Sequence, residues 1–250
     1  MRCLSIGLFA AFTCAFGSDL TLVRTLALQG DTHHVQGIDF DERRVWVTSV
    51  DRTHRKGFLQ EFSLQTGERL REIDVTSGDR FHPGGMAFDG ESLWIPVAEY
   101  RRNSSAVIQK RSARTLEIEL QFEVPDHIGC IAATSGTLVG ANWDSRDFYV
   151  WDRNGKLIRK APNPTPNGYQ DLKFAGGQLA GGGLLPGRTG ALDWLEYPSL
   201  RLLRRITPGS TDRGVPYTNE GMAIRGDRLL LLPEDSPSRL FEFRLARVDP

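Results

Sequence analysis

An all-β fold, a five-bladed β-propeller, is predicted by three features of the sequence. A short apolar segment recurs five times at intervals of roughly 40 to 50 residues, which is the length of one propeller blade. Further strand-like segments follow each copy, with glycine and proline between them, and no long stretch has the 3.6-residue apolar period of a helix. The five copies are VQGIDF from Val35, PGGMAF from Pro83, IGCIAA from Ile128, YQDLKF from Tyr169 and NEGMAI from Asn219.

Each copy is expected to form the first strand of a blade, beside the propeller axis. Continuous apolar runs then predict buried second strands, which begin at Val45, Leu93, Leu138, Gln178 and Leu229. Alternating segments predict half-buried third strands, which begin at Phe58, Ala106, Phe148, Ala191 and Arg239. Fourth strands are predicted in the first four units, and they begin at Arg69, Ile118, Lys156 and Arg201.

The fifth unit has no fourth strand of its own before the sequence reaches Pro250. A matching segment lies near the other terminus, because Leu20–Leu28 (LTLVRTLAL) has the pattern of the fourth strand RLREIDV at Arg69. We expect this N-terminal strand to complete the last blade. The ring would then be closed and its sheet edges protected.

The first 17 residues have the pattern of an export signal. Arg2 supplies a positive start, Cys3–Phe16 is an uncharged apolar run, and Ala15–Gly17 offers small residues for cleavage. A transmembrane anchor is the alternative, but the run is shorter than the roughly 20 residues that span a bilayer. We expect a signal peptide at 1–17, a single propeller domain at 18–250, and a secreted or periplasmic protein with no membrane insertion after signal removal.

Cysteine content and charge limit the remaining possibilities. Removal of the signal leaves Cys130 alone, so no intramolecular disulfide is expected; it aligns with glycines of sister units and is predicted to be a small buried residue. The 31 Lys and Arg residues balance the 31 Asp and Glu residues without long blocks of one sign. This balance argues against nucleic-acid binding. We also expect the protein to be a monomer and to bind a small polar molecule.

Candidate functional residues lie where the first strands begin and the second strands end, since antiparallel neighbours bring both positions to one rim. The starts of three first strands carry His34, His82 and His127. Gln36, Gln170 and Glu220 lie two residues after the corresponding start position in their own units. The second-strand ends carry Asp51, Glu99, Asp144 and Asp235. Arg101 and Arg146 follow two of these acids and are candidate ion-pair partners.

Two interpretations of this pattern remain open. In the structural interpretation, the acids that follow strands accept hydrogen bonds from backbone N–H groups in turns, and the histidines form hydrogen bonds across the axis. In the functional one, imidazoles and carboxylates around one funnel bind a cation or exchange protons with a ligand. The fourth unit departs from the pattern at Gly168 and Gly181–Gly183, either to leave room beside Gln170 and Asp171 or, as we favour, because strands crowd at the axis. Trp143, next to Asp144, is the tryptophan expected to face the ligand rather than the inter-blade core.

Several segments resemble a family of exported bacterial propeller-like proteins that carry a domain of unknown function. The matching segments are HPGGMAFDG from His82, LWIPVAEYR from Leu93, DHIG from Asp126, YQD from Tyr169 and PED from Pro233. The resemblance implies a secreted repeat protein and no particular activity. More loosely, the G-[IM]-[AD]-F element is similar to strands of calcium-dependent lactonase and strictosidine-synthase-like propellers, whose metal lies on the axis and which have more blades.

The favoured hypothesis is a metal-assisted hydrolase of a lactone, ester or phosphate, with a divalent cation, calcium or zinc, in an axial funnel. Its predicted catalytic residues are His82, His127 and Glu99, and its predicted metal ligands are His34, His82, His127 and Glu99. Its predicted ligand-binding residues are His34, Gln36, Arg101, Trp143, Asp144, Arg146, Gln170, Asp171, Glu220, Glu234 and Asp235. The alternative is a non-catalytic extracytoplasmic binding or protein-interaction module that uses the loops at 53–56 and 208–217.

Overall fold

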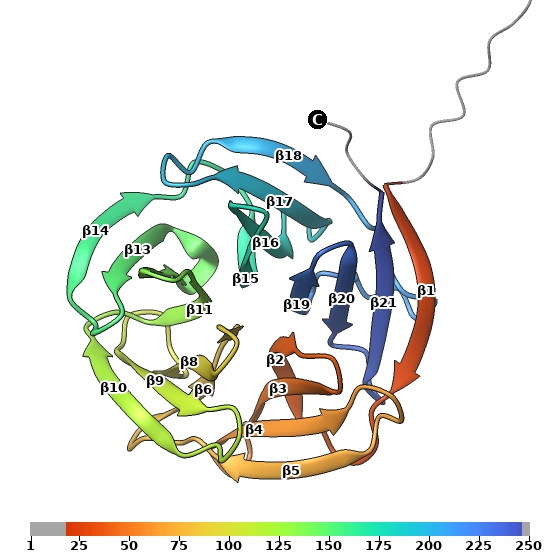
Figure 1. Ribbon diagram of the computed structural model, residues 1–250, viewed down its shortest axis with the longest axis horizontal. Helices are drawn as coiled ribbons and strands as arrows, with labels where there is room; N and C mark the ends of the chain where they lie inside the picture. The colour runs from red at the N-terminus through yellow and green to blue at the C-terminus, as the bar shows by residue number, and fades with distance from the viewer. Residues whose placement is uncertain (1–18, 247–250) are drawn as a thin grey trace, which may run out of the picture.

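The computed structural model describes residues 19–246, which form a ring of five antiparallel sheets around a central axis (Figure 1). The predicted all-β, five-bladed propeller is therefore confirmed. In the described part of the chain the one helical element is a short 3-10 turn, η1 (Trp143–Ser145), and no helix has the length and apolar character to cross a bilayer. The expected signal peptide at 1–17 lies outside the described residues.

Each blade has its first strand at the axis and its fourth strand at the circumference. Blade one consists of β2 (His34–Phe40), β3 (Arg44–Asp51), β4 (Lys56–Ser63) and β5 (Arg69–Asp74). Blade two consists of β6 (Arg80–Pro83), β7 (Ala87–Phe88), β8 (Ser92–Glu99), β9 (Ala106–Ser112) and β10 (Ile118–Val124). Blade three consists of β11 (Ile128–Ala133), β12 (Thr137–Asn142), β13 (Asp147–Asp152) and β14 (Leu157–Pro162).

Blades four and five complete the ring. Blade four consists of β15 (Gly168–Ala175), β16 (Gln178–Leu184), β17 (Gly190–Glu196) and β18 (Leu202–Ile206). Blade five combines β19 (Glu220–Arg225), β20 (Arg228–Pro233) and β21 (Arg239–Leu245) with the N-terminal β1 (Leu20–Ala27). β1 pairs antiparallel with β21 from Leu20 opposite Leu245 to Ala27 opposite Arg239, so the predicted closure by the N-terminal strand is confirmed.

The first strand of blade two is interrupted, which the repeat pattern does not predict. Between β6 and β7 the chain turns toward blade three, where the Gly85 amide donates to the Gly129 carbonyl (2.9 Å) and the Gly85 carbonyl accepts from the Ile131 amide (3.0 Å). A Cβ on Gly84 would lie 2.0 Å from the Gly129 carbonyl oxygen. Two successive glycines are therefore required for the backbones of adjacent blades to approach this closely.

The blades pack through apolar side chains of their second and third strands. Trp46 and Trp94 are fully buried in this core, and so is Cys130, as predicted from its place among glycines. In blade four, a Cβ on Gly181 would lie 2.5 Å from the Tyr169 ring. The strand and the ring are crowded there, and Gly182 and Gly183 are crowded too, which supports the packing explanation for Gly181–Gly183. A Cβ on Gly168 would make only ordinary contacts, the nearest 3.6 Å from the Leu184 carbonyl oxygen.

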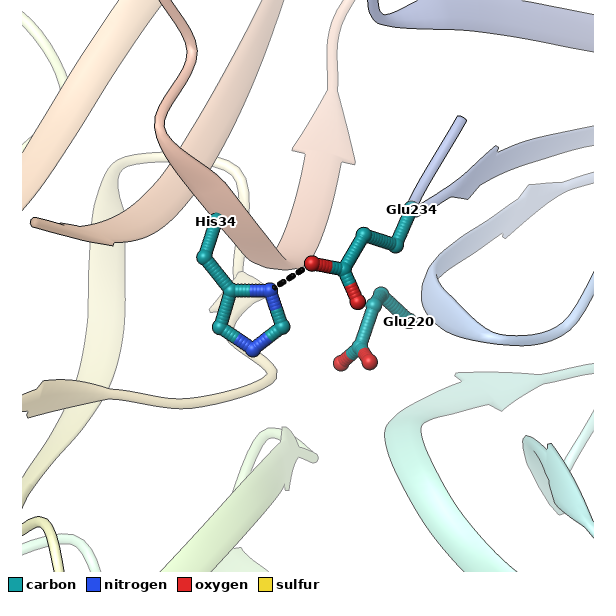
Figure 2. Close-up of side chains that lie close together, drawn as sticks. All are labelled: His34, Glu220 and Glu234. Atoms are coloured by element: carbon teal, nitrogen blue, oxygen red, sulfur yellow. Dashed lines mark hydrogen bonds and ion pairs between the residues drawn. The ribbon is translucent and has the colours of Figure 1, made fainter. Parts of the chain in front are cut away.

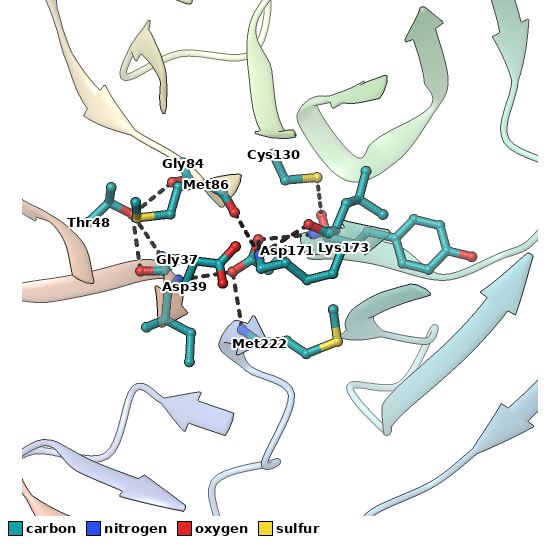
Figure 3. A network of polar contacts seen from close by, with 12 residues as sticks. Gly37, Asp39, Thr48, Gly84, Met86, Cys130, Asp171, Lys173 and Met222 are labelled. Carbon is teal, nitrogen blue, oxygen red and sulfur yellow. Dashed lines mark hydrogen bonds and ion pairs between the residues drawn. The ribbon is translucent and has the colours of Figure 1, made fainter. Parts of the chain in front are cut away.

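A buried ion pair joins the blades at the axis (Figure 3). Asp171 on β15 accepts hydrogen bonds from the amides of Ile38 (3.0 Å) and Met222 (3.2 Å), while Lys173 donates to Asp171 and to the Met86 carbonyl (2.7 Å). Four of the five blades thus meet at one carboxylate–ammonium pair. Asp171 has no exposed surface, so the structure places it in the core and not among the ligand-binding residues.

Candidate functional site: a pocket on the propeller axis

A pocket of about 340 Å³ opens at the rim where the first strands of all five blades begin. This volume is within the range of small-molecule sites. Eight of the residues predicted from sequence line it, namely His34, Gln36, His82, His127, Trp143, Asp144, Gln170 and Glu220. Two larger surface hollows, about 900 and 970 Å³, lie at the opposite rim, and neither is lined by a histidine. The axial pocket is therefore the place where titratable side chains converge.

β-bulges set the direction of two pocket residues. The strand register shifts between Val35 and Gly37 in β2, and between Tyr169 and Asp171 in β15. The extra residues at these positions are Gln36 and Gln170, and both line the pocket. A bulge redirects a side chain that regular pairing would orient differently, so the repeated bulge helps to build the site.

The three pocket histidines are neutral at pH 7. Burial lowers the pKa of His34, lowers that of His82 well below its usual value, and lowers that of His127 to about 4. Each ring has one nitrogen beside a protein acceptor, and these acceptors are Glu234 Oε1 (2.5 Å), Gln36 Oε1 (2.8 Å) and the Arg101 carbonyl (3.0 Å). A neutral imidazole donates from one nitrogen only, so the second nitrogen of each ring carries a lone pair.

His34, Glu220 and Glu234 form the tightest group of titratable side chains in the pocket (Figure 2). One ligand atom from each lies within 4.8 Å of the others. His34 begins β2, whereas Glu220 begins β19 and Glu234 follows β20, so blades one and five supply the group together. The His34 ring and the Glu234 carboxylate are joined through Nδ1 and Oε1.

Glu220 carries a proton at neutral pH. It is only 6% exposed, and burial, together with the charge of Glu234, raises its pKa to about 8 although Arg52 and Arg188 oppose this shift. Its backbone also has a φ of 120°, a conformation that residues with side chains rarely adopt. Backbone strain of this kind is concentrated at functional sites, which supports Glu220 as a functional residue of the pocket.

Of the four acids at the ends of the second strands, Asp144 lines the pocket, whereas Asp51, Glu99 and Asp235 do not, so these acids do not converge as the functional interpretation expects. Glu99 pairs with Arg101 (2.7 Å) outside the pocket, and the hydrogen bond from Arg101 lowers the pKa of Glu99. Asp144 pairs with Arg102 instead of Arg146, which donates to the Trp143 carbonyl. Asp51 and Asp235 are likewise held locally, Asp51 by His54 (2.6 Å) and the buried Asp235 by Arg213 (2.7 Å) and Arg239.

The predicted metal set of His34, His82, His127 and Glu99 is therefore not assembled. Within residues 19–246, the one group of three or more possible ligands joins His34 to Glu220 and Glu234. Glu99 lies apart because its ion pair with Arg101 holds it at the outer rim. Arg101, Arg146, Asp171 and Asp235 also lie outside the pocket lining, while Glu234 reaches the site through its bond to His34.

Three further pocket residues had no signal in the repeat alignment. Tyr100 follows β8, and its ring lies 4.2 Å from the ring of His82 and 6.4 Å from that of Trp143, centre to centre. Asn142 ends β12, and Arg188 lies in the turn between β16 and β17. Tyr100 belongs to the family-like segment LWIPVAEYR, which was the one available hint of its role.

Comparison with known families finds a match to part of the sequence. Residues 50–173 match a family described as "Family of unknown function (DUF6454)". The resemblance to a family that carries a domain of unknown function is confirmed. No curated protein matches the sequence significantly.

Solved structures with the same architecture include a glutaminyl cyclase. The glutaminyl cyclase of Myxococcus xanthus has a TM-score of 0.67 and 17% sequence identity, with 92% of this chain and 97% of that chain covered. The Pan2 WD40 domain of Neurospora crassa has a TM-score of 0.52 and 14% identity, with 86% and 62% covered. At these identities the likeness shows the propeller fold.

The neutral histidines predict a loss of stability in acid. Because the pKa values of His34, His82 and His127 are lower in the folded state, the unfolded chain binds more protons below about pH 6.5. The free energy of unfolding should then fall by up to about 1.4 kcal/mol per pH unit for each histidine between pH 6.5 and its folded pKa. Urea titrations from pH 7 to 4.5 measure how steeply the free energy of unfolding falls with pH. His127→Gln should reduce that slope by the contribution of one histidine, which is up to about 1.4 kcal/mol per pH unit. An unchanged slope in that variant would contradict the assignment.

Proposed function

We propose that the axial pocket is an active site that binds a small polar molecule and exchanges protons with it. The observation that carries this proposal is Glu220, a buried carboxylic acid with a pKa of about 8, close to an imidazole in a cavity of ligand size. Titratable groups whose environments move their proton affinities in opposite directions are typical acid–base pairs. Glu220 and His34 are such a pair, since burial raises the pKa of one and lowers that of the other.

In this proposal Glu220 is the general acid and His34 the general base. Glu234 accepts the Nδ1 proton of His34, which leaves the Nε2 lone pair to remove a proton from water or from the ligand. Glu220 then donates its proton to the leaving group. Hydrolysis of a lactone, an ester or a phosphate ester has these requirements. These roles replace the predicted catalytic set of His82, His127 and Glu99: the two histidines line the pocket, whereas Glu99 lies outside it.

A divalent cation at the same three side chains is the second candidate. An imidazole and two carboxylates are ligands that suit zinc, whereas calcium takes oxygen ligands. A cation between Glu220 and Glu234 would relieve their repulsion and displace the Glu220 proton. Glu220 would then be a metal ligand and not a general acid, and the metal would lower the pKa of bound water.

The name of the Myxococcus structure suggests one further substrate class. Cyclisation of an N-terminal glutamine requires its amine to attack the side-chain amide while ammonia leaves, and a protonated carboxylic acid can supply the proton for that step. At 17% identity the likeness supports the fold alone, so this activity rests on the Glu220 acid. Export beyond the cytoplasm, inferred from residues 1–17, is part of the same proposal.

The test combines a substrate panel with metal titration of the purified protein. Lactones, esters, phosphate esters and peptides with N-terminal glutamine are assayed after chelation and again with zinc or calcium. Turnover by the chelated protein supports the acid–base mechanism. Calorimetric binding of one zinc, with release of up to one proton per ion near pH 7 and turnover only when zinc is present, supports the metal site.

Neither turnover nor a thermal shift with any metal or panel member would overturn both catalytic proposals. That result would favour the non-catalytic binding module, with recognition by the loops at 53–56 and 208–217.

A further inference from the structure

Two arginines at the mouth of the axial pocket lack an acidic partner. Arg52 follows β3, and Arg188 lies in the turn between β16 and β17, so both lie at the rim where the pocket opens. Within residues 19–246, neither guanidinium has an ion pair or a hydrogen bond, and Arg52 only stacks over the Tyr100 ring at 5.1 Å. Their charges therefore remain free to meet a ligand.

The neighbouring rim arginines are all satisfied. Arg101 pairs with Glu99 (2.7 Å), Arg102 with Asp144, Arg213 with Asp235 (2.7 Å) and Arg80 with Glu123 (3.1 Å). Among the described residues no acid forms an ion pair with Arg52 or Arg188, although Asp31, Asp51 and Glu234 line the same surface hollow as Arg52. Two other guanidinium groups in residues 19–246, those of Arg43 and Arg114, are also unpaired, but they lie at the opposite rim, so Arg52 and Arg188 are the unpaired arginines at the pocket mouth.

Both arginines act on the interior of the pocket. Arg188 lines it directly, and Arg52 covers Tyr100, which is another lining residue. The positive charge of each arginine lowers the proton affinity of the buried Glu220, so both guanidinium groups act electrostatically on the same part of the pocket. A ligand held by the arginines would therefore extend toward Glu220.

The inner wall of the pocket offers hydrogen-bond acceptors. His127 is 2% exposed, and its Nδ1 donates to the Arg101 carbonyl, which leaves the Nε2 lone pair bare. His34 likewise gives its Nδ1 proton to Glu234 and keeps a lone pair on Nε2. A ligand that reaches these nitrogens must bring O–H or N–H groups. Trp143 supplies a flat apolar surface beside His127, and Tyr100 lies next to Trp143.

We propose that Arg52 and Arg188 form an anion subsite, which selects ligands with a carboxylate or phosphate at one end and hydroxyl or amine groups at the other. The arginines bind the charged end at the mouth, and His127 and His34 accept from the donor end inside. The inference rests on the proposed function, because it names the substrate class of the same pocket. Guanidinium groups bind both kinds of anion through charge-assisted bonds, so the two sources are separated by experiment.

The experiment compares anions with neutral molecules of nearly the same shape. The probes are gluconate against gluconamide and glucose 6-phosphate against glucose, measured by calorimetry and by Trp143 fluorescence at pH 7. The anionic member of at least one pair is expected to bind about tenfold more tightly, as one charge-assisted contact provides. A preference in the gluconate pair identifies a carboxylate as the group recognised, and a preference in the glucose 6-phosphate pair identifies a phosphate. Salt at 0.5 M, roughly three times the physiological ionic strength, should weaken binding of the anion.

Variants assign the preference to the two arginines. Arg52→Gln and Arg188→Gln should each weaken binding of the anion about three- to tenfold, and the double variant should bind both members of a pair equally. Arg114→Gln is the matched control, an exposed arginine in the turn after β9 at the opposite end of the strands. Equal binding of neutral and anionic members, a preference that survives in the double variant, or no binding by any probe would overturn the proposal.

Failure of this inference is distinguishable from failure of the proposed function. An anion preference in a protein that turns over no substrate would retain the subsite and remove the acid–base mechanism. Turnover of neutral and anionic substrates at equal kcat/KM would retain the mechanism and remove the subsite.

Discussion

Replacement of Glu220 by glutamine should reduce turnover by at least about 100-fold while the propeller remains folded. The amide keeps the shape of the carboxylic acid but has no proton to give to a leaving group. In the parent protein, kcat/KM should fall as the pH rises through about 8, where Glu220 ionises. The value of kcat/KM should also fall in acid, where His34 becomes protonated. This acid limb should lie below the usual pKa of histidine, because burial lowers the pKa of His34. The variant should lose the alkaline limb of this profile.

Stability gives an independent measurement of the same residue. The pKa of Glu220 is raised on folding, so the folded state binds more protons than the unfolded chain between about pH 4.3 and 8, and stability falls as pH rises through that window. Glu220→Gln removes this loss and should melt roughly 10 °C higher than the parent at pH 9. Glu91→Gln, at an exposed glutamate in the turn before β8, should change neither property. Full activity in Glu220→Gln would exclude the residue as the acid.

Replacement of Lys173 by methionine should lower the free energy of unfolding by about 3 to 5 kcal/mol. The change leaves Asp171 buried without its cation and removes the donor to the Met86 carbonyl. Partial removal of a buried ion pair is more costly than removal of both partners, because one charge then remains without compensation. Urea denaturation measures the loss.

The control for this experiment is Lys156→Met, since Lys156 is an exposed lysine in the turn before β14. It should change stability by no more than about 0.5 kcal/mol. A double variant, Asp171→Leu with Lys173→Met, should recover part of the loss because no charge remains buried. A decrease below about 1 kcal/mol in Lys173→Met would show that the axial pair does not hold the blades together.

The propeller was predictable because repetition is visible in sequence. Five copies of one apolar segment, each followed by strands of the same periodicity, admit few arrangements other than a ring of sheets. The orphan strand at Leu20–Leu28 matched the one missing fourth strand, so the closure could also be inferred. The pocket rim was predictable for the same reason, as equivalent positions in each repeat must face the same axis.

The roles of individual residues were decided by tertiary structure. Glu99 and Glu220 are both acids at a rim position, but Arg101 holds Glu99 outside the pocket while Glu220 is buried beside Glu234. Sequence spacing does not show which arginine a carboxylate will meet, and a bulge such as that at Gln36 changes which side chains turn inward.

The sequence by itself determined the number of blades, the way the ring closes and the rim at which polar side chains gather. Tertiary structure alone decided that His34, Glu220 and Glu234 meet, that Asp171 lies in the core, and that Arg52 and Arg188 have no ion-pair partner among residues 19–246. The physical reason is range. Strand periodicity is a local property repeated along the chain, whereas proton affinity depends on burial and on charges that come from other blades.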